Sequence, residues 1–393
     1  MSRTFSRRAR TRAAAAALVA LAAVTAAPAP ASALPGSSAG TLIAALPQPS
    51  GWRSMPGGGT VVSYWTTRAD GSPVRASGAL FVPPGPAPAA GWPVLAWDHG
   101  TAGLGPRCGG QAVPLPRPAR EKADRQGDLL RRLLSRGFAV AAPDYIGNGL
   151  FDTGVHPYLE VRSQASATID MVRAARAARP ELSRTWAVVG ESQGGHAALS
   201  TGHRQASYAP ELDFRGTIAI DPGSDVEKLL QLAGPYVPVL PAENDTVVAL
   251  VVTILGALRA ARPDAAVDSY LTPLGRRILD DTATLCMDGI GQRTRGLGIG
   301  ALLATPLAVG PFRRVIEDYM TLPTTGYDAP ILLLLNAADK VVPSPLHATL
   351  VAQLAAAGTG FEVVPGVGEH VVLSPEMYAA IDRFLARIQP AGR

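Results

Sequence analysis

One pentapeptide constrains the fold of this chain more than any other feature. Gly190-Glu191-Ser192-Gln193-Gly194 follows an apolar run at residues 186–189 and precedes a helix-forming run that starts at His196. A serine between glycines at such a junction is typical of a nucleophile elbow, where the backbone turns sharply and exposes the hydroxyl at the top of a sheet. The pattern predicts a nucleophilic serine. The same pattern at residues 36–40 lies in a Pro/Ser/Ala/Gly-rich segment, and we interpret that copy as linker.

The first 33 residues have the composition of an export signal. Five arginines precede an apolar run at residues 13–27, and Ala31-Ser32-Ala33 supplies a small-x-small cleavage pattern. We expect a signal peptide over residues 1–33, a mature chain that begins near Leu34, and secretion by either the Sec or the Tat route. The leader holds five of the 36 basic residues, which leaves 31 against 31 acidic ones. A neutral mature chain gives no support for binding to nucleic acid.

The chain has only two cysteines, Cys108 and Cys286. Export to an oxidising compartment favours a disulfide between them, and the alternative is two buried free thiols. A bond would tie the segment around Cys286 to the region that follows residues 97–101.

Strand and helix signals alternate from about residue 60, which predicts an α/β architecture. The alternation breaks at residues 223–325, which have the pattern of helices separated by Pro and Gly. We therefore expect an α/β-hydrolase fold, with a mostly parallel central sheet flanked by helices and a helical cap inserted between the nucleophile and acid strands. The expected divisions are an N-terminal arm (34–58), the first part of the core (59–222), the cap (223–325) and the second part of the core (326–393).

Residues 247–258 of the expected cap are almost wholly apolar. The run is too short to cross a bilayer, so it forms either a buried helix or a lid surface that meets lipid. We expect its side chains, Leu255 and Leu258 among them, to line an acyl channel over Ser192.

A serine hydroxyl needs a base to take its proton, and the base needs an acid to hold its tautomer. In α/β-hydrolases these residues follow in the order Ser, acid, His, each after a strand. His370, in a glycine-rich loop after the last predicted strand, is the predicted base. Asp339, in the exit loop of the penultimate strand, is the predicted acid, and Asp221 is the alternative.

The other histidines after Ser192 are less suitable. His196 and His203 follow the elbow too closely along the chain to approach the hydroxyl from the opposite loop. His347 falls early in a predicted helix, where we interpret it as a packed or solvated residue.

The tetrahedral intermediate needs backbone N–H donors for its oxyanion. The N–H of Gln193, directly after the serine, is the first predicted donor. The second is expected from the loop Trp97-Asp98-His99-Gly100-Thr101, with Thr101 favoured and Asp98 as the alternative.

At these residues the chain resembles the secretory lipase family of fungi and actinomycetes. The resemblance implies acyl-ester hydrolysis, often of lipids, with a cap that shapes the acyl pocket. The segments that carry it are Asp98-His99-Gly100-Thr101, Pro143-Asp144-Tyr145-Ile146-Gly147, Ser192-Gln193-Gly194-Gly195-His196, the helical cap, and the loops of Asp339 and His370.

The leading interpretation is a secreted lipase or esterase that uses an acyl-enzyme, with a small-molecule or lipid ester as substrate and neither cofactor nor metal. Two alternatives are a peptidase or acyltransferase on the same triad and a catalytically silent binding protein. Dehalogenases and epoxide hydrolases are excluded, because Ser192 stands where they have a nucleophilic Asp. Acyl chain length, oligomeric state and transient contact of the cap with a lipid interface are left open.

Overall fold

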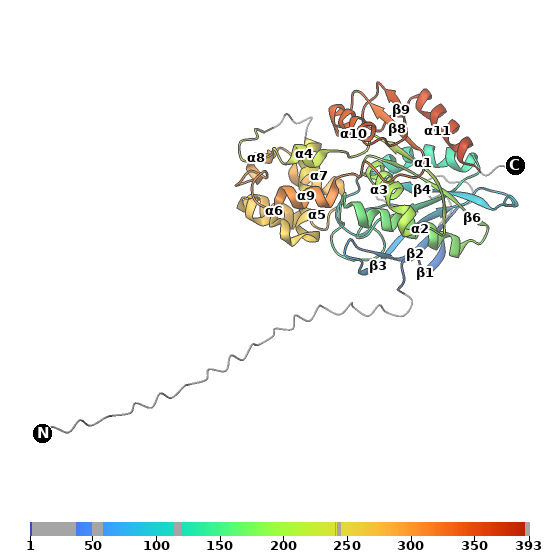
Figure 1. Cartoon of the computed structure of the whole chain (residues 1–393), viewed down its shortest axis with the longest axis horizontal. Helices are drawn as coiled ribbons and strands as arrows, with labels where there is room; N and C mark the ends of the chain where they lie inside the picture. Colours follow the sequence, from blue (N-terminus) through green and yellow to red (C-terminus); the bar gives the residue numbers. More distant parts are fainter. Residues whose placement is uncertain (2–36, 49–57, 114–118, 240, 242–244, 390–393) are drawn as a thin grey trace. The chain divides into compact units, whose positions relative to one another are not determined.

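A nine-stranded sheet is the centre of the described part of the chain (Figure 1). The computed structural model describes Met1 and residues 37–48, 58–113, 119–239, 241 and 245–389. The sheet order is β1-β2-β3-β5-β4-β6-β7-β8-β9. The strands are β1 (Leu42–Gln48), β2 (Gly59–Thr67), β3 (Pro73–Phe81), β4 (Trp92–Asp98), β5 (Ala139–Pro143), β6 (Leu182–Glu191), β7 (Asp213–Ile220), β8 (Ile331–Asn336) and β9 (Phe361–Gly366).

The sheet is mostly parallel. The pairs β1–β2, β2–β3 and β3–β5 are antiparallel, and every pair from β5–β4 to β8–β9 is parallel. Parallel strands present their carboxyl ends at one edge, so the loops after β4, β6, β7, β8 and β9 meet there. This edge positions every candidate catalytic side chain.

Helices cover both faces of the sheet because successive strand residues point to opposite sides. Leu95 packs with α1 and α11, whereas its neighbours Val94 and Ala96 pack with α2 and α3. The flanking helices are α1 (Ala119–Ser135), α2 (Val161–Ala178), α3 (Gln193–Tyr208), α10 (Ser344–Ala356) and α11 (Pro375–Ile388).

A group of short helices separates β7 from β8, and Figure 1 shows them gathered together. They have an apolar cluster of their own, in which Leu255, Leu258 and Phe312 are fully buried. The helices are α4 (Val226–Leu230), α5 (Asp245–Ala261), η3 (Pro263–Ala265), η4 (Val267–Tyr270), α6 (Pro273–Thr282), α7 (Met287–Thr294), α8 (Ile299–Leu302) and α9 (Phe312–Met320). The exact division into core and cap stays a prediction.

The apolar run at residues 247–258 lies in α5, and most of its side chains are buried in the protein. Of the two alternatives, the buried helix describes it better. In the described residues no single helix is long and apolar enough to span a membrane, and α5 passes such a test only together with Pro263–Tyr270, across a bend of 116°.

The strands from β2 onward and the helices between them confirm the alternation of strand and helix signals expected from about residue 60. β1 was not expected, because its residues fall in the presumed N-terminal arm. The predicted signal peptide lies outside the described residues, apart from Met1. By their contacts, Ala33–Arg393 form one compact unit.

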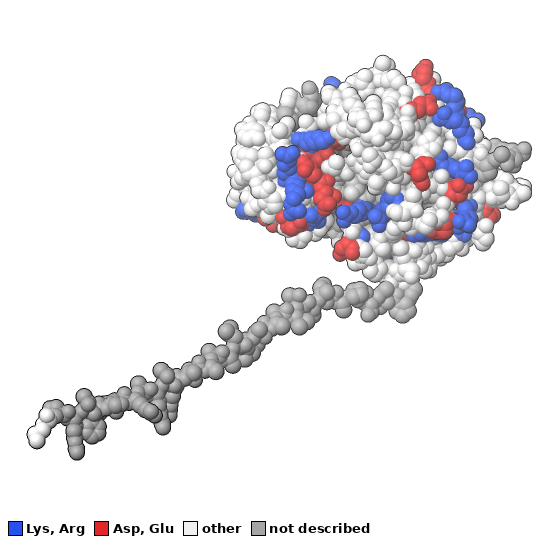
Figure 2. All heavy atoms as spheres, in the orientation of Figure 1, with Lys and Arg blue, Asp and Glu red and all other residues white. Residues whose placement is uncertain are grey.

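Basic and acidic side chains lie next to one another on the face shown in Figure 2 and do not form separate patches. Many basic and acidic side chains of the described residues form ion pairs, such as Arg262 with Asp264 and Asp318. This mixed surface agrees with the balance of charges in the sequence after residue 33.

Candidate active site

Ser192 occupies a strained turn between β6 and α3. Its φ of 56° and ψ of −118° lie outside the regions that a serine ordinarily adopts. Two glycines make the turn sterically feasible. A Cβ on Gly190 would lie 2.1 Å from the carbonyl oxygen of Gly194, and one on Gly194 would lie 1.8 Å from that of Asp98. The elbow therefore depends on glycine at both positions.

The structure brings Ser192, His370 and Asp339 together in one hydrogen-bonded line. His370 Nε2 lies 2.8 Å from Ser192 Oγ, and His370 Nδ1 lies 2.6 Å from Asp339 Oδ2. Because a carboxylate accepts a hydrogen bond, Nδ1 carries the ring proton and Nε2 is free to accept from the serine hydroxyl. This is the geometry that a nucleophile and its general base require.

Asp339 is held firmly as an anion. Its Oδ1 accepts from the backbone N–H groups of Val341 and Val342, at 2.8 and 2.9 Å. Burial alone would raise the pKa of Asp339, but hydrogen bonds from His347 and His370 outweigh that effect and hold the pKa well below its usual range. The carboxylate therefore stays ionised wherever the base is active.

Asp221, the alternative acid, has different partners. Its two oxygens accept from the backbone N–H and side-chain amide of Asn336 and from the backbone N–H of Val371, each at 2.7 Å. No hydrogen bond joins it to the His370 ring in the described residues. Its geometry suits support of the two loops better than orientation of the base.

The two histidines of α3, His196 and His203, have partners outside the triad. His196 is buried between the side chain of Gln164 and the carbonyl of Met320, and burial lowers its pKa to about 4. His203 is exposed and lies 2.8 Å from the carbonyl of Thr325. The backbone N–H of His196 donates to the Ser192 carbonyl, but in the described residues no hydrogen bond joins either imidazole ring to Ser192.

His347 is not the ordinary helix residue that the sequence suggested. It is buried in the first turns of α10, and its Nε2 lies 3.2 Å from Asp339 Oδ2. Its short spacing from Asp339, with the helix-starting Pro343 between them, is the one sequence signal that could have indicated this contact.

The predicted oxyanion donors lie beside the elbow. Gln193 is the first residue of α3, where backbone N–H groups have no carbonyl one turn earlier in the helix. Thr101 follows β4, and its hydroxyl lies 2.7 Å from that of Tyr158. Asp98 is still a strand residue, paired with Gly190, with its side chain directed at Thr168 of α2. Thr101 therefore stays the better candidate for the second donor.

His156 supports Gln193 and was missed in the sequence. Its Nδ1 lies 2.8 Å from the carbonyl of Ile146, so Nδ1 carries the proton. Its Nε2 therefore accepts from the side-chain amide of Gln193, also at 2.8 Å. Burial lowers the pKa of His156 to about 3, which keeps this ring neutral.

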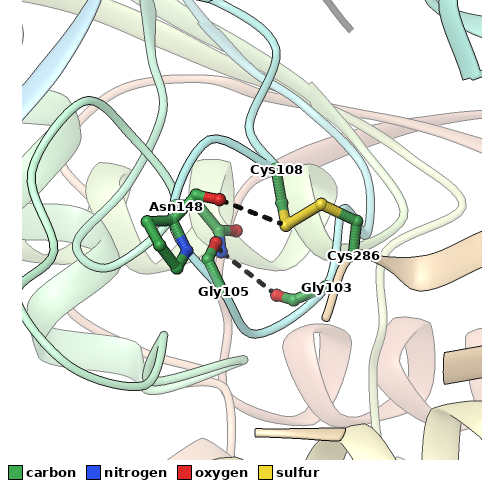
Figure 3. The surroundings of a disulfide bond; sticks show 6 residues. Gly103, Gly105, Cys108, Asn148 and Cys286 are labelled. Atoms are coloured by element: carbon green, nitrogen blue, oxygen red, sulfur yellow. Dashed lines mark hydrogen bonds between the residues drawn. A yellow bond between two sulfur atoms is a disulfide. The ribbon is translucent and has the colours of Figure 1, made fainter. Parts of the chain in front are cut away.

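The predicted disulfide is present and joins Cys108 to Cys286 (Figure 3). Next to it, the residues after Thr101 form a short antiparallel ladder with the start of α7: Leu104 donates to the carbonyl of Leu285, and Met287 donates to that of Ala102. The bond thus anchors the candidate oxyanion loop to the helices between β7 and β8.

Asn148 braces the same loop from the other side. Its side-chain amide donates to the carbonyls of Gly103 and Gly105, at 3.2 and 3.0 Å (Figure 3). The conformation of the loop is therefore set both by a covalent bond and by a buried amide.

An apolar cavity of about 190 Å³ reaches Ser192. One wall is a stripe of α5 at helical spacing, formed by Val247, Leu250, Val251 and Ile254. Leu255 and Leu258, which we expected in this wall, point instead into the apolar cluster between the helices. The expectation was wrong for those two residues because they lie further along α5, beyond the turns that border the cavity.

A family model named secretory lipase matches residues 124–291. The resemblance inferred from the sequence motifs is confirmed by this match. A probable inactive lipase of Mycobacterium tuberculosis (strain CDC 1551 / Oshkosh) is 25% identical over 280 residues, a region that covers 68% of this chain and 56% of the relative. The chain thus spans little more than half the length of that protein.

Solved structures share the fold. Candida antarctica lipase A has a TM-score of 0.72 at 18% identity, over 90% of this chain and 84% of that one. The rice cell wall degrading esterase LipA from Xanthomonas oryzae has a TM-score of 0.66 at 22% identity, over 89% and 97% of the two chains. At such identities the likeness concerns the fold, and it confirms the predicted α/β-hydrolase class.

Proposed function

We propose that this chain is a secreted serine hydrolase that cleaves carboxylic esters, as a lipase or esterase, through an acyl-enzyme at Ser192. The observation that carries the proposal is the pair of hydrogen bonds from Ser192 through His370 to Asp339. The family match and the lipase and esterase folds support ester hydrolysis as the reaction class.

Acylation begins when Ser192 Oγ attacks the ester carbonyl and His370 Nε2 takes the hydroxyl proton. Asp339 stabilises the imidazolium that forms, without itself becoming protonated. The carbonyl oxygen becomes an oxyanion, for which the N–H groups of Gln193 and Thr101 are the proposed donors. The intermediate collapses as His370 gives its proton to the departing alcohol.

Deacylation repeats these steps with water in place of the serine. His370 Nε2 takes a proton from water as the water oxygen attacks the acyl carbonyl, and it then returns the proton to Ser192 Oγ. The products are a carboxylic acid and the free enzyme. The same neutral tautomer of His370 thus serves both halves of the reaction.

The cavity beside Ser192 suits the acyl part of the ester. Its wall on α5 is wholly aliphatic, and the α4 residues Leu229 and Leu230 extend it. We propose residues 223–325 as a cap whose main role is to form this wall. A second cavity of about 570 Å³ borders His370 and includes the charged Glu191 and Lys340, which suits a more polar alcohol.

Secretion is proposed from the leader pattern at residues 1–33, and the disulfide supports it because such bonds persist in oxidising compartments. Mass spectrometry of the culture supernatant would test this. A mature N-terminus near Leu34 is expected, and a full-length chain that stays in the cytoplasm would contradict the proposal.

A catalytically silent binding protein is the second candidate, favoured by the name of the Mycobacterium relative. Labelling with a fluorophosphonate, followed by peptide mass spectrometry, separates the two candidates. Stoichiometric modification of Ser192 is expected, with Ser38→Ala labelled like the wild type. Absence of labelling in the folded, exported protein would instead support the silent candidate.

A peptidase or acyltransferase would use the same three residues. Initial rates on matched ester and amide substrates, with and without an added alcohol acceptor, distinguish them. We expect ester hydrolysis to be faster than both amide hydrolysis and acyl transfer to the alcohol.

A further inference from the structure

Asp339 Oδ2 has two histidine partners. His370 Nδ1 lies 2.6 Å from it and His347 Nε2 lies 3.2 Å from it. A serine hydrolase needs only the first of these contacts. The second comes from α10, a helix that contributes no other group to the triad.

The tautomer of His347 follows from its surroundings. Its Nδ1 is buried and has no hydrogen-bond partner in the described residues. A buried N–H without an acceptor costs more than an unused weak acceptor next to apolar groups, and a carboxylate can only accept. The proton therefore belongs on Nε2, which donates to Asp339.

The titratable groups near His347 Nε2 in the described residues are Asp339 and Asp221, with His370 on the other side of Asp339. Asp221 Oδ1 lies 3.7 Å from His347 Nε2, too far for a hydrogen bond, while Asp339 Oδ2 is within reach. The oxygens of Asp221 and Asp339 and a ring nitrogen of His370 all lie within 4.8 Å of one another. The His347 N–H thus points at the place where two buried carboxyl groups meet.

We propose that His347 is a positioning residue of the triad, which donates a hydrogen bond to Asp339 and thereby sets the basicity of His370. This inference rests on the proposed function of Ser192, His370 and Asp339. A donor on Oδ2 draws negative charge away from the oxygen that His370 Nδ1 also uses. The imidazolium form of His370 is then stabilised less than it would be by an unshared carboxylate.

Loss of the His347 N–H donor should change the pH dependence of the rate in one direction. Asp339 keeps its place, because Val341 and Val342 still hold Oδ1 and His370 still holds Oδ2. Its charge is then shared with fewer donors, so protonated His370 becomes more stable. The acid limb of the rate profile should therefore move to higher pH.

The test is the pH profile of kcat/KM for p-nitrophenyl butyrate, because its acid limb reports the base of the free enzyme. His347→Leu removes the N–H donor and replaces the ring with an apolar side chain of similar size. His347→Gln keeps an N–H donor at a similar reach. His203→Gln serves as the matched control, since His203 is exposed, its ring lies beside the Thr325 carbonyl and the Tyr327 ring, and it has no contact with the triad in the described residues.

The acid limb of His347→Leu is expected to move up by about 0.5 to 1 pH unit, a fraction of what a full neighbouring charge does. His347→Gln and His203→Gln should match the wild-type limb. An unchanged or lowered limb in His347→Leu, with or without a uniform loss of kcat, would overturn the proposal and leave His347 as packing. Thermal melting checks that each variant is folded.

If His347→Leu does not fold, His347→Asn carries the same test, because its shorter amide cannot reach Asp339. Failure of the proposed function looks different from failure of this inference. In that case the wild type itself would show neither fluorophosphonate labelling of Ser192 nor ester hydrolysis at any pH.

Discussion

Asp339 and Asp221 hold two consecutive residues of one loop from two adjacent strands. Asp339 accepts from the ring of His370 at 2.6 Å, and Asp221 accepts from the backbone N–H of Val371 at 2.7 Å. The two aspartates leave β8 and β7, which pair directly in the sheet. The proposed acid, Asp339, thus contacts the ring of the proposed base, and Asp221 holds the loop that carries it.

Asp339→Asn and Asp221→Asn should fail in different ways. Asp339→Asn places an amide against His370 and favours the wrong tautomer, so we expect kcat to fall about 10⁴-fold with little change in melting temperature. Asp221→Asn leaves at least one backbone or amide donor unpaired, which should cost about 1 to 3 kcal/mol of stability.

Steady-state kinetics and thermal melting of both variants check this contrast. A fall in kcat of about 10⁴-fold in Asp221→Asn, with an unchanged melting temperature, would instead identify Asp221 as the acid.

Asp98→Asn should stabilise the protein increasingly as pH rises. Burial raises the pKa of Asp98 well above its usual range, although a hydrogen bond from Thr168 opposes this. The Thr168 hydroxyl contacts both Asp98 Oδ1 and the carbonyl of Gln164, and it can donate to only one of them. A protonated Asp98 resolves the conflict by donating to Thr168, and the amide of Asn would do the same.

The sign follows from linkage. An acid whose pKa is raised on folding contributes stability below its unfolded pKa, about 4, and loses it as pH rises toward the folded value. Urea unfolding at about pH 5 and pH 8 should therefore show a larger advantage for Asp98→Asn at the higher pH. An equal or reversed difference would mean that the carboxylate is ionised in the folded protein.

Reduction of the Cys108–Cys286 disulfide should lower the stability of the protein and its rate of ester hydrolysis. The bond joins residues 178 apart, for which chain entropy allows up to roughly 5 kcal/mol. Its loss also frees the ladder of Ala102 and Leu104 beside the candidate oxyanion donor Thr101. We expect a lower melting temperature and a decrease in kcat of about tenfold, a fraction of the loss of one oxyanion donor.

The double variant Cys108→Ser with Cys286→Ser should reproduce both effects without reductant. The reduced wild type should first be shown to have free thiols. If its melting temperature and kcat were then unchanged, the disulfide would have no part in stability or in the rate.

The acyl cavity should set a chain-length preference. A cavity of about 150 Å³ holds benzene, so one of about 190 Å³ accommodates on the order of six to eight carbons. Each buried methylene contributes about 0.8 kcal/mol before ordering costs. We expect kcat/KM on p-nitrophenyl esters to rise from acetate to about octanoate and then level off.

Ile254→Trp should fill this cavity and lower octanoate hydrolysis at least tenfold relative to acetate. Leu232→Trp is the control, because Leu232 is exposed and lies outside the cavity wall. A wild-type rate that falls steadily beyond butyrate would contradict the assignment of this cavity to the acyl chain.

The sequence could indicate Ser192, His370 and Asp339 as candidate site residues because their signals are local. The elbow glycines surround Ser192, and His370 and Asp339 each follow a recognisable strand. His347 and His156 were missed because their roles depend on partners brought together by the fold. Periodicity also placed Leu255 and Leu258 on an apolar helix without saying which turns of that helix border the site.

The most direct test of the account compares Ser192→Ala with the wild type on p-nitrophenyl butyrate, after circular dichroism has shown that both are folded. The account predicts a loss of about 10⁶-fold in kcat, as expected for removal of a triad nucleophile, and unchanged activity in Ser38→Ala. Retention of more than a few per cent of the wild-type rate by Ser192→Ala would show that Ser192 is not the nucleophile.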